Sequence, residues 1–559
     1  MPRKVTGPRT DSDPDSSSRA SEKPSRNLQV ILILCLMDSD SAFPKAEGIF
    51  GILGGGDSGP SKIIDARIDS KKLAGIEVRA DLMLSAGETL EAVLTGVREL
   101  ITRNLQVIFT VRIPEHGGTF RDSEDERLKI YQAGLAAGAS VLDAEWGTPV
   151  AKKLHAAESP LILSHHDFTN MISAPELSRL TGEIESWNPR AVKIVPTASR
   201  LTDAARMLEW VSQARTKGPR RIGFAMGEAG VASRILAHAY GAPVTYAGLA
   251  GAVAPGQVSL AELLEVYRPA TRTRDTRIFG VAGNKALMSF SPYLHNLSLA
   301  SRDIDAIYLP FQVQSFAEMV EFAQAVGVEG LSVTIPFKED ALRCADRVDS
   351  RSRTCGASNT ILFRQNPNGG ENRESIESFN TDYDGVRAPL EARIGSLEGI
   401  QVGVLGNGGA ARGAVLALKE AGASPTLFFR NFERGDPVAR ELGVPGALIE
   451  NLGRDRQRVY INATPVGGDA GDPSPVPDEL LTAREGEQPR VAFDMVYQPA
   501  RTTFLERAGA CDAVEIQGRE MLIAQGVAQF RLFTGEVVPI EEFSRNYQRG
   551  EELRDPVTP

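Results

Sequence analysis

Histidine and cysteine are scarce in this chain of 559 residues, which contains six histidines and four cysteines. The cysteines are far apart and include no C-x-x-C pair; they are Cys35, Cys344, Cys355 and Cys511. This spacing excludes the common zinc-binding frameworks and the disulfide-rich secreted scaffolds, and it indicates a reducing compartment. We therefore expect a cytoplasmic protein that holds no metal.

Long apolar runs and an excess of positive charge are lacking as well. The apolar run "LQVILILCLM" covers residues 28–37, which is too short to span a bilayer but suits a buried strand. A signal peptide is the alternative because Lys23 and Arg26 precede the run, although "DSDSAF" follows where small cleavage-site residues are needed. The net charge of −10 argues against a general affinity for nucleic acid or anionic membranes. The oligomeric state is left open.

The first half of the chain alternates short β-branched runs with amphipathic segments. Residues 1–26 are rich in Ser, Pro and charged residues, which predicts a disordered tail. Eight runs then have the composition of strands, at 30–36, 75–80, 106–112, 139–146, 160–166, 190–196, 220–227 and 242–248. Strands that alternate with helices in this way predict an α/β fold, a (β/α)8 barrel, over residues 27–268. We interpret the glycine-rich "FGILGGGDSGPSK" at 50–62 as a loop.

A polar linker at 269–276 separates this half from a second alternating series. The pattern predicts two α/β lobes, at 277–394 and 395–515, of which the second has the strand–glycine turn–helix unit of a Rossmann-type dinucleotide-binding domain. Helices at 516–546 are expected to return to the first lobe, and 547–559 form a tail.

One lysine lies inside an otherwise apolar predicted strand, "AVKIVP". Burial lowers the pKa of such an amine, and the neutral form is the nucleophile that Schiff-base chemistry with a ketone requires. His166, one strand earlier, could move protons beside Lys193 near neutral pH. The alternative is a lysine that extends to the barrel mouth and pairs with Asp143 or Glu145. Neighbouring residues on a strand point to opposite faces, so only one of His165 and His166 can share the face of Lys193.

Six stretches of this half together resemble type I 3-dehydroquinate dehydratase: "EVRAD" (77–81), "FTVRIPEHGG" (109–118), "HDF" (166–168), "VKIVP" (192–196), "MGEAGVASR" (226–234) and "APGQ" (254–257). The resemblance implies that Lys193 forms an imine with 3-dehydroquinate, that His166 is the proton carrier and that Glu115 orients His166. It also implies that Arg234 and Gln257 bind the substrate carboxylate, with Glu77, Arg79 and Arg112 around the ring hydroxyls or the lysine.

In the second half, "GNGGAARG" (406–413) lies between a strand and a helix, where glycines let the backbone approach a pyrophosphate. The next strand ends in "FFRNFER". Arginine in place of the usual acidic residue favours the 2′-phosphate of NADP over NAD. A solvated basic turn is the alternative, and Glu433 among the arginines leaves it open. The residues that we assign to the cofactor are Gly406, Asn407, Gly408, Gly409, Ala410, Arg430, Asn431, Arg434, Asn462, Ala463 and Thr464.

The first lobe contains "NKALMSFSPYLHN" (284–296), "SVTIPFK" (332–338), "SNT" (358–360) and "NTD" (380–382). A lysine and an aspartate suit proton transfer to an alkoxide, although singly Lys338 could be an exposed helix residue and Asp382 a helix N-cap. With "INATPVG" (461–467), "DMVYQP" (494–499) and "GREMLIAQGVAQF" (518–530), these stretches resemble shikimate dehydrogenase. The resemblance implies a catalytic pair of Lys338 and Asp382. It implies substrate contacts from Ser289, Ser291, Thr334, Asn359, Tyr497 and Gln525.

The two resemblances predict one enzyme that dehydrates 3-dehydroquinate to 3-dehydroshikimate and then reduces 3-dehydroshikimate to shikimate with NADPH. One alternative is a quinate or shikimate dehydrogenase of catabolism. Another is a catalytically inactive sensor of the same metabolites, which the presence of Lys193, His166, Lys338 and Asp382 disfavours.

Overall fold

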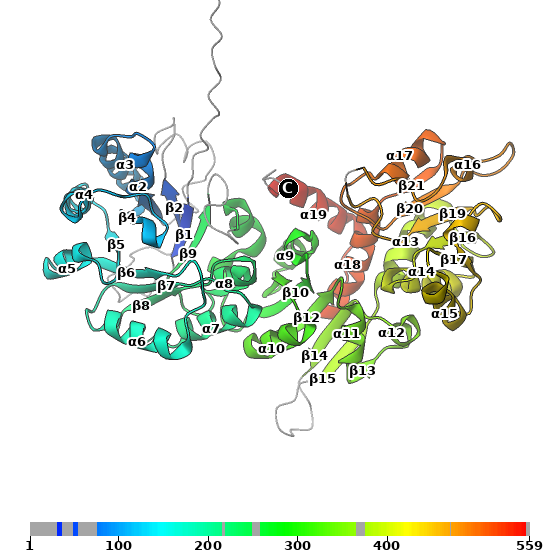
Figure 1. The fold of residues 1–559 in the computed structure, drawn as a ribbon, viewed down its shortest axis with the longest axis horizontal. Coiled ribbons are helices and arrows are strands. Elements are labelled where there is room, and N and C mark those ends of the chain that lie inside the picture. Colours follow the sequence, from blue (N-terminus) through cyan, green and yellow to red (C-terminus); the bar gives the residue numbers. More distant parts are fainter. Residues whose placement is uncertain are drawn as a thin grey trace, which may run out of the picture.

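The computed structural model describes residues 31–35, 48–53, 75–214, 218–248, 258–364, 375–469 and 471–554. The predicted N-terminal tail, the predicted carboxylate ligand Gln257 and part of the predicted loop at 50–62 lie outside these ranges. Along the chain follow a barrel-like domain, a first α/β lobe and a second α/β lobe, and the C-terminal helix α19 returns to the middle of the molecule, beside α9 and α18 (Figure 1).

The first domain is built on a nine-stranded sheet in the order β8-β7-β6-β5-β4-β3-β2-β1-β9. Its strands are β1 (Ile31–Cys35), β2 (Gly48–Leu53), β3 (Gly75–Arg79), β4 (Gln106–Thr110), β5 (Val141–Glu145), β6 (Leu161–His166), β7 (Ala191–Val195), β8 (Arg220–Gly223) and β9 (Val244–Gly248). Strands β2 to β8 pair in parallel. Strand β1 is antiparallel to both β2 and β9, so β2 and β9 run in the same direction. Eight strands of one direction therefore form the predicted barrel sheet, with β1 inserted between two of them.

The first strand of this barrel is not the predicted one. The run at 30–36 forms the inserted strand β1, and the first strand of the common direction is β2, in the glycine-rich segment that we interpreted as a loop. Glycine weakens a strand because it has no side chain to pack. Hydrogen bonds from β1 on one edge and β3 on the other outweigh this weak local preference, since strand formation depends strongly on context.

Helices between the strands form the outer layer of the barrel. They are α2 (Ala80–Ser85), α3 (Leu90–Thr102), α4 (Glu124–Ala136), α5 (Pro149–Ala156), α6 (Ala174–Glu185), α7 (Leu201–Ser212) and α8 (Val231–Leu236), with short 3-10 turns at η2 (Pro114–His116) and η3 (Glu228–Gly230). Side-chain caps begin several of them; Ser123, for example, accepts from the N–H of Glu126. Alternation on β4 separates two cores, because Ile108 joins the inner cluster while Val107 and Phe109 pack under the helices. Strand residues that point inward therefore face one shared interior.

The first lobe has a six-stranded mixed sheet in the order β11-β10-β12-β14-β15-β13. A π-helical turn η4 (Glu262–Tyr267) and η5 (Pro269–Thr271) connect it to the barrel. Its elements are β10 (Arg277–Gly283), η6 (Ala286–Met288), α9 (Ser291–Ser301), β11 (Ala306–Gln312), α10 (Phe316–Val326), β12 (Val328–Val333), α11 (Lys338–Arg343), β13 (Arg347–Val348), α12 (Ser350–Cys355), β14 (Thr360–Arg364), β15 (Ser375–Phe379) and α13 (Asp382–Ile394).

The second lobe is a fully parallel sheet in the order β18-β17-β16-β19-β20-β21, which is the doubly wound arrangement predicted for a dinucleotide-binding domain. Its elements are β16 (Gln401–Leu405), α14 (Gly409–Glu420), β17 (Ser424–Phe429), α15 (Phe432–Leu442), β18 (Gly446–Leu448), η7 (Ile449–Asn451), β19 (Val459–Asn462), α16 (Asp478–Leu481), β20 (Val491–Asp494), α17 (Thr503–Ala510) and β21 (Val514–Ile516). Helices α18 (Gly518–Thr534) and α19 (Ile540–Leu553) then return to the first lobe, where both pack on α9.

The barrel contacts the first lobe directly. Helix α7 packs against α10, and the hydroxyl of Tyr293 donates to Glu262 at 2.6 Å. Gln312, at the end of β11, donates to Glu228 in the barrel at 3.0 Å. Within the described ranges, the hydrogen bonds between the barrel and the rest of the chain fall on the first lobe or on α19, and none reaches the second lobe.

Over the same described ranges, the helices are too short or too polar to cross a bilayer.

Candidate active sites

Lys193 lies in the barrel interior, on β7, with 2% of its surface exposed. Its ammonium nitrogen is 2.7 Å from Oδ2 of Asp143 and 3.9 Å from Oε1 of Glu77. The nitrogen also lies 4.1 Å from the ring centroid of Tyr246 on β9. Burial lowers the pKa of Lys193, and the two carboxylates oppose that shift only in part. Of the two pairings that the sequence left open, the structure has Asp143, and Glu145 instead binds Arg127 and the N–H of Ile113.

His166 faces the same interior, at the carboxyl end of β6. The guanidinium of Arg112 donates to its imidazole, and Arg112 is itself 3.0 Å from Asp143. Burial, followed by the positive charge of Arg112, lowers the pKa of His166 well below its usual value. Because arginine can only donate, the contact requires an unprotonated ring nitrogen. His166 is therefore a neutral base in this site.

His165 points away from Lys193, as strand alternation requires. In the part of the chain that the structure describes, His165 contacts neither Lys193 nor Arg112, and its ring packs edge-on against His116 at 5.6 Å. Burial lowers the pKa of His165 as well. Both adjacent histidines pack against His116, but only His166 is hydrogen-bonded to Arg112 beside Lys193.

The structure does not bring Glu115 to His166. Glu115 is exposed in the short turn η2, and no described hydrogen bond joins it to either histidine. The neighbouring His116, not Glu115, lies beside His166. Its Nδ1 accepts from the backbone N–H of His166 at 3.2 Å, and its ring lies 5.9 Å from the His166 ring. Burial lowers the pKa of His116 to about 4, so this ring is neutral too. Sequence reasoning missed His116; its position before the Gly117–Gly118 turn was the available signal.

The remaining predicted barrel residues differ in whether their side chains already have a partner within the protein. Arg79 is held by Asp81 through two hydrogen bonds of 2.7 and 2.8 Å, and Glu77 accepts from Thr110 at 2.6 Å. Arg234 is 4% exposed, has no carboxylate partner among the described residues and lies 4.5 Å from the ring of Phe224. Burial lowers its pKa to about 10. An unneutralised buried guanidinium is suited to a carboxylate ligand.

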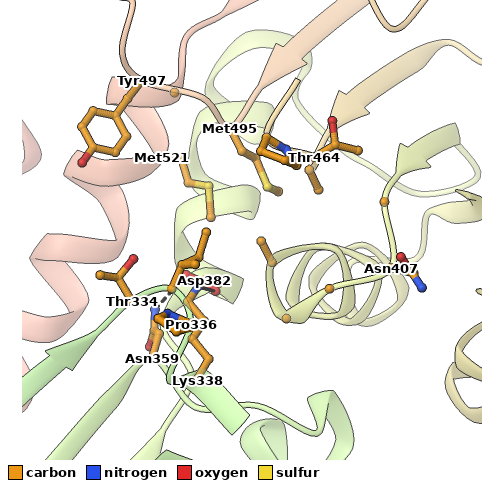
Figure 2. Close-up of a pocket in the computed structure, with 18 of the residues that line it drawn as sticks. Thr334, Pro336, Lys338, Asn359, Asp382, Asn407, Thr464, Met495, Tyr497 and Met521 are labelled. Atoms are coloured by element: carbon orange, nitrogen blue, oxygen red, sulfur yellow. Dashed lines mark hydrogen bonds and ion pairs between the residues drawn. The ribbon is translucent and has the colours of Figure 1, made fainter. Parts of the chain in front are cut away.

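The second site lies in a cavity of about 1010 Å³ between the two α/β lobes. Lys338, the first residue of α11, donates to Oδ2 of Asp382 at 2.5 Å. Asp382 is 3% exposed and is the first residue of α13, so it is not the N-cap that one interpretation suggested. Asn359 donates to the other carboxylate oxygen at 2.8 Å. Figure 2 shows Lys338, Asp382 and Asn359 together on one side of the cavity, with Thr464 and Asn407 across from them.

All but one of the residues that we predicted for this site outside the barrel line the same cavity. They are Ser289, Ser291, Thr334, Lys338, Asn359, Asp382, Gly406, Asn407, Gly408, Gly409, Ala410, Arg430, Asn431, Arg434, Ala463, Thr464, Tyr497 and Gln525. The exception is Asn462, which is fully buried behind the wall, where it donates to Asp494 at 2.9 Å and to the carbonyl of Val466 at 2.8 Å. The cavity also includes Lys285, Met495 and Met521, which sequence reasoning missed.

The glycine turn has the geometry that a dinucleotide site needs. Gly406 has φ +117°, and a Cβ there would come within 2.9 Å of the carbonyl oxygen of Ala463, so only glycine fits. Gly408 caps α14, whose first N–H groups open toward the cavity. This end of the cavity fits a pyrophosphate.

Two arginines follow β17, the strand after the glycine turn: Arg430 comes directly after the strand and Arg434 lies in the first turn of α15. Arg430 and Arg434 are exposed, and their side chains form no ion pair with the described residues. Asn431 has a second role, because its side chain caps α15 by accepting from the N–H of Arg434 at 3.0 Å. The cap holds Arg434 at the first turn of the helix, so that both cations border the cavity. Free cations at this position fit a 2′-phosphate.

Comparisons with known proteins match the two halves separately and together. Residues 64–273 match the family model of type I 3-dehydroquinase, residues 281–361 that of the shikimate dehydrogenase substrate binding domain, and residues 518–543 that of the shikimate 5'-dehydrogenase C-terminal domain. A shikimate dehydrogenase (NADP(+)) of Syntrophobacter fumaroxidans is 34% identical over 270 residues, which cover 47% of this chain and 89% of that protein. A solved structure of dehydroquinate dehydratase and shikimate dehydrogenase from S. pombe is 25% identical, with a TM-score of 0.41, and the match covers 86% of this chain and 93% of that one.

One relative spans both domains. The bifunctional 3-dehydroquinate dehydratase/shikimate dehydrogenase, chloroplastic, of Arabidopsis thaliana is 30% identical over 484 residues, which cover 83% of this chain and 78% of the relative. In this chain the barrel with Lys193 comes first, and the two lobes with Lys338 and Asp382 follow. This is the order of the two activities in the name of that relative. By this shared length and order, the chain belongs to the family of bifunctional 3-dehydroquinate dehydratase/shikimate dehydrogenases.

Proposed function

We propose that this chain dehydrates 3-dehydroquinate to 3-dehydroshikimate in the barrel and reduces 3-dehydroshikimate to shikimate, with NADPH, in the cavity between the lobes. The observation that carries the proposal is the presence, in one chain, of a buried lysine beside a neutral histidine and of a separate lysine–aspartate pair. The product of the first reaction is the substrate of the second.

In the barrel, the neutral amine of Lys193 attacks the C3 ketone, and loss of water leaves an iminium. The iminium draws electrons and acidifies the C2 proton, which His166 accepts because its ring is unprotonated. His166 then returns that proton to the C1 hydroxyl, which leaves as water as the double bond forms. Hydrolysis of the imine releases 3-dehydroshikimate and the free amine. Arg234 binds the substrate carboxylate.

In the cavity, Lys338 donates a proton to the carbonyl oxygen of 3-dehydroshikimate, and Asp382 holds the ammonium in place. NADPH supplies the hydride when it is bound. The glycine turn from Gly406 to Ala410 holds the pyrophosphate, and Arg430 and Arg434 hold the 2′-phosphate. Ser289 and Ser291 bind the substrate carboxylate, with Thr334, Asn359, Tyr497 and Gln525 around the ring.

A cytoplasmic location is part of the proposal. The described cysteines, Cys344, Cys355 and Cys511, are all unpaired thiols, which agrees with a reducing compartment. The Arabidopsis relative is chloroplastic by its name. Fractionation of cells that express the full chain distinguishes the two locations.

Two experiments test the two reactions. Borohydride added with 3-dehydroquinate should leave a reduced adduct on Lys193 alone, located by peptide mass spectrometry. An adduct at another lysine, or dehydration without any adduct, would contradict the imine. Lys338→Ala should lower the rate of reduction by roughly 100-fold or more, as removal of a general acid does, while the barrel reaction continues. Unchanged reduction would remove that role from Lys338.

A further inference from the structure

A chain of buried hydrogen bonds runs from helix α18 to the carboxylate of Asp382. It starts at Gln529, which is 1% exposed, and passes through Thr360 and Asn359, which are 0% and 2% exposed. We propose that Gln529 is a positioning residue for the reduction, because it holds Thr360 and the backbone carbonyl of Asn359 in the arrangement in which the Asn359 amide nitrogen faces Asp382. This inference rests on the proposed role of Lys338 and Asp382.

The orientation of Gln529 follows from its partners. Its Nε2 lies 3.3 Å from the backbone carbonyl oxygen of Asn359, and a carbonyl can only accept. The amide nitrogen must therefore face β14. The oxygen, Oε1, faces β12, where the hydroxyl of Ser332 donates to it at 2.8 Å. Ser332 accepts in turn from the hydroxyl of Tyr308 at 2.6 Å.

The next link transmits this direction to Asn359. Nε2 of Gln529 donates to the hydroxyl oxygen of Thr360 at 2.9 Å, so the proton of that hydroxyl is free to point elsewhere. It points to Oδ1 of Asn359, at 2.9 Å. The backbone N–H of Thr381 donates to the same oxygen, also at 2.9 Å. Because a backbone N–H can only donate, the Thr381 contact puts the oxygen of the Asn359 amide on this side, and the Thr360 hydroxyl supports the same orientation.

The amide nitrogen of Asn359 consequently faces Asp382 and donates to its Oδ1 at 2.8 Å. The other oxygen of Asp382 receives Lys338. A hydrogen bond from a neutral donor favours the ionised carboxylate, and a flipped amide would place an oxygen against it instead. Gln529, Asn359 and Asp382 lie in the cavity wall and are each 3% exposed or less, so a lost donor leaves its partner poorly solvated. Gln529 thus affects Asp382 through two intermediate residues, without touching it.

The test compares Gln529→Met, which keeps the length and removes both polar ends, with Arg531→Met, an exposed position on the same helix. We expect Gln529→Met to lower kcat of the reduction roughly tenfold, the effect of one or two lost buried hydrogen bonds. The loss should fall on kcat, because the Asn359 amide then holds the Asp382 carboxylate, and through it Lys338, less firmly. KM for NADPH and the dehydration rate in the barrel should stay unchanged, as should all values for Arg531→Met.

Thr360→Val provides a second variant that interrupts the same chain, and it should lower kcat of the reduction in the same way, with KM for NADPH unchanged. It decides the question if Gln529→Met fails to fold, which loss of barrel activity and of the circular dichroism spectrum would reveal. A wild-type kcat of the reduction in Thr360→Val and in a folded Gln529→Met overturns the inference. If Lys338→Ala abolishes reduction in the same assays, the proposed function is retained even when the inference about Gln529 fails.

Discussion

Nδ1 of His116 accepts a hydrogen bond from the backbone N–H of His166 at 3.2 Å. This contact fixes the end of β6, from which the His166 ring projects toward Lys193. His116→Ala should therefore lower the dehydration rate roughly tenfold, as the loss of one partly buried hydrogen bond does. Steady-state assays with 3-dehydroquinate measure the effect. Glu115→Ala is the matched control, since Glu115 is exposed, and it should change the rate little. The reverse order of effects would restore Glu115 as the residue that orients the base.

The two adjacent histidines should differ sharply. His166→Ala should lower dehydration by roughly 10²–10⁴-fold, the usual contribution of a general base, while borohydride still traps an adduct on Lys193. His165→Ala should leave both trapping and turnover near the wild-type level, because its ring faces away from the lysine. Loss of dehydration in folded His165→Ala would show that His165, and not His166, is the general base.

The cofactor preference should depend on the arginines after β17. Replacement of both Arg430 and Arg434 by Ser should raise KM for NADPH by roughly tenfold or more, since each charged hydrogen bond to a phosphate contributes about 1.5–3 kcal/mol in protected sites and less when exposed. KM for NADH should hardly change, because NADH has no 2′-phosphate. Arg440→Ser is the control on the same helix, where Arg440 pairs with Asp436 at 2.8 Å. Equal losses for both cofactors would favour the interpretation of a solvated basic turn.

Stability should depend on pH through Asp494. Burial raises its pKa from 3.8 to about 6, although hydrogen bonds from Thr502, Val496 and Asn462 oppose the shift. A carboxyl with a raised pKa binds its proton more tightly in the native state, so stability falls as pH rises from about 4 to about 6. Asp494→Asn should remove a cost on the order of 1–3 kcal/mol above pH 6.

Thermal unfolding at several pH values checks this expectation. The Tm of Asp494→Asn should exceed that of the wild type at pH 8 and match it near pH 4. The neutral amide keeps an acceptor for Asn462, and its NH2 can donate to the hydroxyl of Thr502. A variant that melts at a lower temperature than the wild type at pH 8 would mean that the charged carboxylate is stabilising.

Periodicity and motifs predicted most of the fold because local pattern and tertiary structure agree over most of the chain. Strand alternation predicted that only one of His165 and His166 shares the face of Lys193, and His166 is the one that contacts Arg112. The choice between Asp143 and Glu145 could not be made this way, because the two lie two residues apart on β5. A residue from the outer layer, Arg127 on α4, holds Glu145 and leaves Asp143 for Lys193, and this contact is visible only in three dimensions.

The misplaced predictions share a different cause. Strand β2 is stabilised by neighbours on both edges rather than by its own glycine-rich sequence. The position of Glu115 depends on a turn that ends at Gly117 with φ +79°, and such a turn has no period that a sequence pattern could reveal. Asn462 belongs to a motif that borders the cavity, but its amide nitrogen is hydrogen-bonded to Asp494 and to the carbonyl of Val466. A position next to cavity-lining residues in the sequence therefore did not imply access to a ligand.

The barrel is attached to the first lobe of the two-lobed second half of the chain. Within the described residues its hydrogen bonds fall on the first lobe and on α19, and none joins the nucleotide-binding lobe. A swing of the nucleotide-binding lobe about the segments that join it to the first lobe would therefore break no bond to the barrel. Fusion of the barrel at this face thus leaves the nucleotide-binding lobe without a described hydrogen bond to the additional catalytic domain.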